Sequence, residues 1–127
     1  MENIVKTDLI DMWKENDIVF FEYKVQNIDL KIAKEIVQLR LNYTNYQDSL
    51  LYIDNCNIKI IDKGARDYFG SSEGTKNVKA AAIFTNSVLT SFLANFFLSV
   101  NLSRLKSKIK VFNSKEKALI WLNQCNK

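Results

Sequence analysis

The sequence predicts an α/β fold in which helices pack on a mixed β-sheet, in the order β-β-α-β-α-β-α-β-α. Short runs of β-branched and aromatic residues alternate with longer segments of helical periodicity, a pattern typical of parallel strands joined by helical crossovers. The first two predicted strands are joined by a short turn, so they form an antiparallel hairpin and make the sheet mixed. The segment between Lys79 and Arg104 holds no charged residue, which marks it as the centre of the core.

The first elements follow from turn and cap signals. Residues 4–14 and 17–25 are predicted to form the hairpin, with its turn at residues 15–17 and Trp13 as a packing anchor. Asp29 is predicted to cap a helix over residues 30–43. Helical spacing places one group of residues inward: Ile32, Ile36, Leu39 and Tyr43. The remaining face is expected to be solvated by Lys31, Lys34, Glu35, Gln38 and Arg40.

The middle of the chain supplies a central strand and a short helix. The apolar run at residues 49–54 predicts the strand, and residues 55–62 are expected to form an irregular connection. Asp62 is predicted to cap a short helix whose inner residues are Ala65, Tyr68 and Phe69. The segment 70–74 contains two glycines and is expected to end this helix, with glycine in a positive-φ conformation.

The charge-free segment then predicts a buried strand over residues 78–85 and a helix that begins at Asn86 or Ser87. This helix carries a broad apolar face that includes Phe92, Phe96 and Phe97. A stripe of small polar residues covers its opposite side: Ser87, Ser91, Asn95 and Ser99. A last strand is predicted at residues 108–112. Asn113 should then cap a terminal helix, with Glu116 in the capping-box position and an inner face of Ala118, Trp121, Leu122 and Cys125.

Composition narrows the function classes. The chain has 127 residues, which fits a single domain over 1–127, and a formal net charge of +4 without a nucleic-acid-binding motif. It contains no histidine, which removes the commonest general base and most zinc and iron sites. The two cysteines, Cys56 and Cys125, form no metal-ligand spacing. We therefore expect a cytoplasmic protein without a cofactor, and polar residues within 80–100 argue against a membrane span there.

Three stretches carry a resemblance to a known family: YIDNCNIKIIDKGARDYFGSSEG, AAIFTNSVLTSFLANFFLSVN and KIKVFNSKEKALIWL. Together with the predicted element order, they resemble the SpoIIAA-like proteins. These are small bacterial domains related in fold to the STAS domains of anti-sigma factor antagonists and to the CRAL-TRIO lipid carriers. The resemblance covers essentially the whole chain and implies a STAS-like fold.

The resemblance also implies where a recognition corner would lie. In STAS antagonists an aspartate that ends the third strand is followed eight residues later by a second aspartate and then by a phosphorylatable serine. This chain has Asp54 and Asp62 at those positions, followed by Lys63 and Gly64. Lysine cannot accept the phosphate, so the switching cycle of the antagonists is not implied here. The candidate recognition or ligand corner comprises these four residues with Asn86 and Ser87.

Three functions follow as alternatives. The first is a non-enzymatic regulatory or protein-interaction module that acts alone or as a homodimer, with Ser91, Asn95 and Ser99 as a candidate interface stripe. The second is a carrier or sensor of a small apolar or lipid-like ligand. The third is an enzyme that uses Asp54, Asp62, Lys63, Arg66 and Asp67, and it is the least favoured because charges around a capped helix usually serve the cap and solvent. The basic run at Arg104, Lys106, Lys108 and Lys110 is interpreted as protection of a sheet edge or as an anion-attracting surface.

Overall fold

The computed structural model describes residues 2–86 and 108–126, and within them the predicted α/β architecture is present. The main sheet has six strands in the order β1-β2-β3-β5-β7-β8. These strands are β1 (Glu2–Lys6), β2 (Ile10–Glu15), β3 (Ile18–Tyr23), β5 (Ser49–Asp54), β7 (Val78–Phe84) and β8 (Lys108–Phe112). Pairs β1–β2 and β2–β3 are antiparallel, and β3–β5, β5–β7 and β7–β8 are parallel, so the sheet is mixed as predicted.

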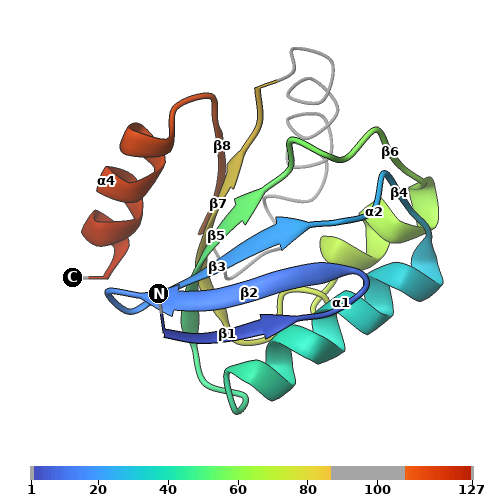
Figure 1. The fold of residues 1–127 in the computed structure, drawn as a ribbon, viewed down its shortest axis with the longest axis horizontal. Helices are drawn as coiled ribbons and strands as arrows, with labels where there is room; N and C mark the ends of the chain where they lie inside the picture. The colour runs from blue at the N-terminus through green and yellow to red at the C-terminus, as the bar shows by residue number, and fades with distance from the viewer. Residues whose placement is uncertain (1, 87–107, 127) are drawn as a thin grey trace.

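Helices cover both faces of this sheet (Figure 1). Helices α1 (Leu30–Tyr43) and α2 (Lys63–Phe69) pack on one face, where Ile36 and Ala65 join a core with Phe21, Leu51 and Ala81. Helix α4 (Lys115–Cys125) packs on the other face. There Ala118 and Leu122 are fully buried against strand residues of the opposite parity, among them Phe20, Tyr52 and Ala82. The two-residue period of a strand thus divides one sheet into two cores.

The hairpin prediction was wrong in one respect, because its first arm is divided into two strands. The chain turns at residues 7–9, where the Thr7 hydroxyl oxygen accepts hydrogen bonds from the backbone N–H groups of Leu9 and Ile10. These side-chain bonds take the place of strand hydrogen bonds at residues 7–9, and the chain turns so that β1 pairs antiparallel with β2. The predicted turn at residues 15–17 is confirmed, with Asn16 and Asp17 at φ 50° and 67°. Both residue types tolerate this left-handed conformation.

Two helix starts are confirmed and a third is shifted. The side chains of Asp29 and Asp62 accept hydrogen bonds from the N–H groups of Ile32 and Ala65, at 2.8 Å in each case. Helix α4 is capped by Ser114 instead of the predicted Asn113, since the Ser114 hydroxyl accepts a bond from the N–H of Lys117. Glu116 therefore lies in the first turn and not in the capping-box position.

Residues 55–61 are less irregular than predicted. Strand β4 (Asn27–Ile28) pairs in parallel with β6 (Ile60–Ile61). The two strands form a separate two-stranded sheet beside the start of α1. The glycine prediction also needs correction. None of the described glycines has a positive φ, and Gly70 ends α2 at φ −89°. The predicted helix that follows Asn86, with Ser87, Ser91, Asn95, Ser99 and its phenylalanines, lies outside the described residues.

Candidate functional site

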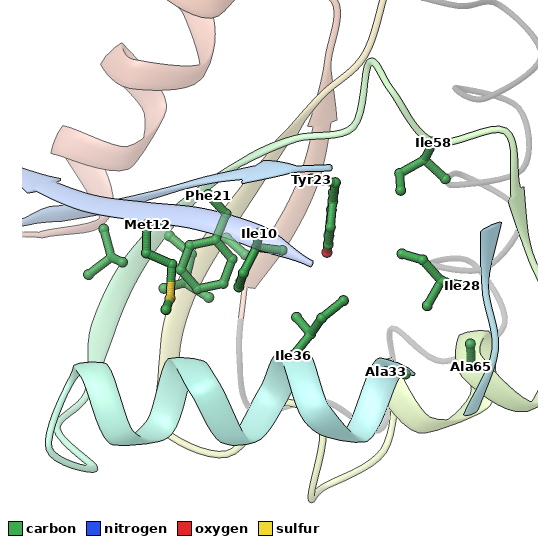
Figure 2. Packing of buried hydrophobic residues seen from close by; sticks show 12 residues of the cluster. Ile10, Met12, Phe21, Tyr23, Ile28, Ala33, Ile36, Ile58 and Ala65 are labelled. Carbon is green, nitrogen blue, oxygen red and sulfur yellow. The ribbon is translucent and has the colours of Figure 1, made fainter. Parts of the chain in front are cut away.

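A cavity of about 120 Å³ lies between the sheet and the layer formed by α1 and α2. Side chains from β3, β5, β7 and β8 form its floor. Residues of both helices, of the segment 55–61 and of the segment before β7 complete the wall. Most of these side chains are apolar. Three of the lining residues, Tyr23, Ile36 and Ile58, point toward a common space together with Ile28 of the adjoining core, as Figure 2 shows from close by.

Small side chains help to leave this space open. Strand β7 contains three consecutive alanines at residues 80–82, and Ala81 is the one that faces the cavity. Ala81 lies opposite Leu51 of β5 and Ile109 of β8 in the parallel ladder. A larger side chain at this central position would reach further toward the helices. The alanine run therefore supplies both a tightly packed face toward α4, through Ala80 and Ala82, and a roomier face toward the cavity.

Arg40 of α1 is the charged residue buried deepest in this wall, with an exposed fraction of 2%. Its guanidinium donates to the carbonyl oxygens of Lys76 at 2.8 Å and Gly74 at 3.3 Å. These bonds tie α1 to the segment that leads into β7. Burial lowers the pKa of Arg40 to about 10, and the nearby Tyr23 and Tyr68 partly oppose this shift. The guanidinium is therefore still charged at neutral pH.

The prediction that Arg40 solvates the outer face of its helix was wrong. Arg40 lies four residues after Ile36 and three after Val37, so it falls on the buried stripe of α1. The spacing from Ile36 and Val37 therefore indicates that Arg40 is buried. The prediction followed instead the general rule that arginine is rarely buried unless it is paired. Arg66 of α2 also lines the cavity, and its guanidinium donates to the Ile61 carbonyl oxygen at 2.9 Å.

The predicted recognition corner is divided into two groups. Asp54 ends β5 beside Phe84 of β7, so it lies at the carboxyl edge of the sheet near Asn86, which is exposed. Asp62, Lys63 and Gly64 begin α2 after the small β4–β6 sheet. Among the described residues, no hydrogen bond or ion pair joins the first group to the second. Lys63 instead pairs with Asp67 at 2.9 Å on an exposed surface, where such a pair contributes a few tenths of a kcal/mol.

Cys56 lies beside Asp54 of the first group, and the sequence did not lead us to predict it as part of the recognition corner. The Asp54 carboxylate accepts a hydrogen bond from the backbone N–H of Cys56 at 2.9 Å, so it holds the cysteine beside its own charge. Burial raises the pKa of the Cys56 thiol from 9.0 to about 11, and both the hydrogen bond between this thiol and the Asp54 side chain and the negative charge of Asp54 act in the same direction. This environment suppresses the thiolate, which is opposite to what a nucleophilic cysteine requires.

We expect Cys56 to be alkylated by iodoacetamide at pH 8 about tenfold more slowly than a free cysteine. The thiolate fraction falls about a hundredfold when the pKa rises from 9.0 to about 11, and the greater nucleophilicity of the more basic thiolate offsets about tenfold of this. The rate should keep rising with pH until about 11 instead of levelling above 9. Mass spectrometry of a Cys125→Ser variant measures the rate at Cys56 alone. Asp54→Asn should accelerate it, and a plateau near pH 9 would contradict the shift.

Two further findings apply to the described part of the chain. No helix within residues 2–86 and 108–126 is long and apolar enough to cross a membrane. The same residues contain no cluster of three or more Asp, Glu, Cys or His side chains arranged to hold a metal ion. Strand β8 lies at the edge of the sheet, with Lys108 and Lys110 exposed, which fits the interpretation of these lysines as edge protection.

Comparison with known proteins places the fold. The structure is similar to the crystal structure of an uncharacterized protein from the DUF3478 family with a SpoIIAA-like fold, from Shewanella loihica PV-4. The TM-score is 0.63 at 18% sequence identity, and the match covers 89% of this chain and 91% of the other. This likeness establishes the predicted SpoIIAA-like fold. No curated protein sequence matches the chain. A family profile matches residues 12–126, and the chain therefore belongs to the family described as Domain of unknown function (DUF7793).

Proposed function

We propose that this protein is a binding module for a small apolar molecule, which it holds in the cavity between the sheet and helices α1 and α2. The observation that carries the proposal is the cavity itself, about 120 Å³ in volume and walled mainly by apolar side chains of four parallel strands and two helices. Well-packed interiors contain few voids larger than a water molecule. A partly open apolar hollow of this size beside a central alanine is therefore suited to a ligand that enters from the surface.

Binding is favoured over catalysis by the chemistry of the wall. Its described polar groups are cationic side chains, an amide, hydroxyls and backbone carbonyls, and the described lining contains no carboxylate or thiol that would act as a general base or nucleophile. The alternative role as a protein-interaction module is supported by the fold alone and stays a prediction. Lys63, its proposed recognition residue, is already paired with Asp67.

The size of the cavity limits the ligand and its affinity. An apolar cavity of about 150 Å³ takes up benzene, so this slightly smaller one suits a body of about six carbon atoms. Burial of six methylene groups contributes about 5 kcal/mol at roughly 0.8 kcal/mol each. Because association itself costs free energy, we expect dissociation constants near 1 mM for such a body alone. This range fits a sensor of an abundant metabolite better than a tight carrier.

The experiment uses two six-carbon probes, 1-hexanol and hexanoate, added at about 10 mM to the full chain. Binding of either probe to the native state should raise the melting temperature and appear as chemical-shift changes at residues of the cavity wall. Absence of both effects with both probes would overturn the proposed function. A small molecule found in the purified protein by native mass spectrometry would support it independently.

Ala81→Leu tests whether the probes occupy this cavity. The added carbon atoms enter open space, so the free energy of unfolding of the variant should stay within about 1 kcal/mol of the parent's. The melting temperature and chemical shifts of the variant should no longer change when either probe is added. Ala82→Leu is the matched control, because Ala82 is fully buried on the opposite face against α4. We expect it to lose about 1–3 kcal/mol of unfolding free energy through overpacking and to retain probe binding. Equal destabilisation by the two variants would contradict the presence of usable space beside Ala81.

A further inference from the structure

The charged residues in the described cavity wall all carry the same sign. They are Arg40 from α1, Lys59 from the segment before β6 and Arg66 from α2, and the described lining includes no aspartate or glutamate. A wall that is otherwise apolar thus has three cations around one space of about 120 Å³. Charges of one sign lining a cleft with low-dielectric walls raise the local concentration of the opposite ion. The cavity is therefore electrostatically suited to an anion that carries an apolar body.

Within the described part of the chain, the hydrogen bonds of Arg40 leave some of its donors available to recognise such an anion. A guanidinium carries five N–H donors in a planar fork, and the bonds to the carbonyls of Gly74 and Lys76 account for two of them. Those two acceptors are neutral, whereas the Arg40 side chain is almost completely buried. A buried charge is normally paired with an opposite charge. The lowered pKa of Arg40 agrees with a buried charge that lacks an anionic partner in the described structure, since burial is the largest cause of the shift.

Tyr23 provides a second donor from the sheet side. Its side chain lines the cavity from β3, is 6% exposed, and lies close enough to Arg40 for the two groups to interact electrostatically. In Figure 2 its hydroxyl points toward α1, the helix that carries Arg40. Burial raises the pKa of this phenol above its usual range, so the hydroxyl retains its proton at neutral pH. A protonated phenol can donate to an anion that a neighbouring guanidinium also binds.

We propose that the ligand of this cavity is a short apolar monocarboxylate whose carboxylate group is bound by Arg40 and Tyr23. This inference rests on the proposed function and adds the chemical class of the ligand to it. Two carboxylate oxygens match donors that approach from two elements, and a planar guanidinium suits this group better than a point charge does. The remaining wall accommodates the hydrocarbon chain, which the volume limits to about six carbon atoms.

The test compares hexanoate with 1-hexanol, which have chains of equal length and differ in the charged group. At pH 7 we expect the native chain to bind hexanoate at least about tenfold more tightly, because hydrogen bonds to a charged group are roughly twice as strong as neutral ones. Titrations followed by chemical shifts give both dissociation constants. Equal affinity for the two probes, or a preference for the alcohol, would overturn the carboxylate inference and leave the proposed function in place. Binding of neither probe would overturn the proposed function itself.

Two variants assign the preference to particular residues. Arg40→Met keeps a long apolar stem, and its ratio of hexanoate to hexanol affinity should fall to about one. Tyr23→Phe keeps the ring and removes only the hydroxyl, so it tests the inference even if Arg40→Met does not fold. We expect it to weaken hexanoate binding several-fold and to leave hexanol binding unchanged. Lys31→Met, at an exposed position of α1 outside the cavity lining, is the control for general attraction of anions and should reduce hexanoate affinity by less than about twofold. An unchanged ratio in Tyr23→Phe, or a larger loss in Lys31→Met than in Tyr23→Phe, would contradict the assignment.

Discussion

Phe20→Ala is expected to lower the free energy of unfolding by about 3–5 kcal/mol, the range for truncation of a buried phenylalanine. Phe20 is 4% exposed on β3, in the core beneath α4. Its ring stacks on Trp13 at a centroid distance of 5.6 Å and contacts Tyr52 at 5.2 Å. The Lys115 ammonium lies 5.9 Å from its centre. Removal of this ring therefore leaves a cavity and interrupts a row of aromatic side chains across three strands.

Urea denaturation followed by circular dichroism measures this loss. Phe20→Leu is the matched control, since it keeps most of the apolar volume and should lose less than half as much as the alanine variant. A double-mutant cycle with Trp13→Ala isolates the ring stacking, for which we expect a coupling of about 0.5–1.5 kcal/mol. A loss below about 1 kcal/mol for Phe20→Ala would mean that this face of the sheet is not packed as described.

Local signals explain why much of the fold could be predicted from the sequence. Asp29 and Asp62 each stand immediately before a helical pattern, and a cap depends on only three or four consecutive residues. The strand at residues 49–54 is a short apolar run bounded by polar residues. By contrast, β4 and β6 contain two residues each, too few to show an alternating pattern. Their pairing depends on chain segments more than 30 residues apart, which local patterns do not encode.

The candidate site was much harder to predict. The corner at Asp54, Asp62 and Lys63 came from a family resemblance, and among the described residues no hydrogen bond or ion pair joins Asp54 to the other two. The cavity arises because Ala81 and the helices of its face do not fill the space between them, and a sequence pattern does not report unfilled volume. Arg40 was assigned to solvent by its residue type although its spacing from Ile36 indicated burial. Its two carbonyl partners come from a segment 34 to 36 residues further along the chain.

Gly74→Ala is the second substitution for which we expect a large effect, a loss of about 3 kcal/mol or more in the free energy of unfolding. A Cβ atom at Gly74 would overlap the carbonyl oxygen of Tyr68 and lie 2.9 Å from the Cα of Phe69. These are backbone atoms near the end of α2, and the Tyr68 carbonyl is further held by the backbone N–H of Ser71. The segment must therefore shift as a whole, and it carries the carbonyl that binds Arg40.

Gly64→Ala is the matched control, with an expected effect of opposite sign. Gly64 is exposed in the first turn of α2, and a Cβ there would meet only Leu30 and Asp62, at ordinary contact distances of 3.5 and 3.6 Å. Alanine in place of glycine in a helix should stabilise the protein by up to about 1 kcal/mol. Urea denaturation of both variants gives the two changes directly. If Gly74→Ala is as stable as the parent, the close approach of residues 68 and 74 is not a feature of the folded protein. The path by which Arg40 is buried would then need a different explanation. If instead the two substitutions change stability in opposite directions, space rather than backbone conformation is the reason for glycine at position 74.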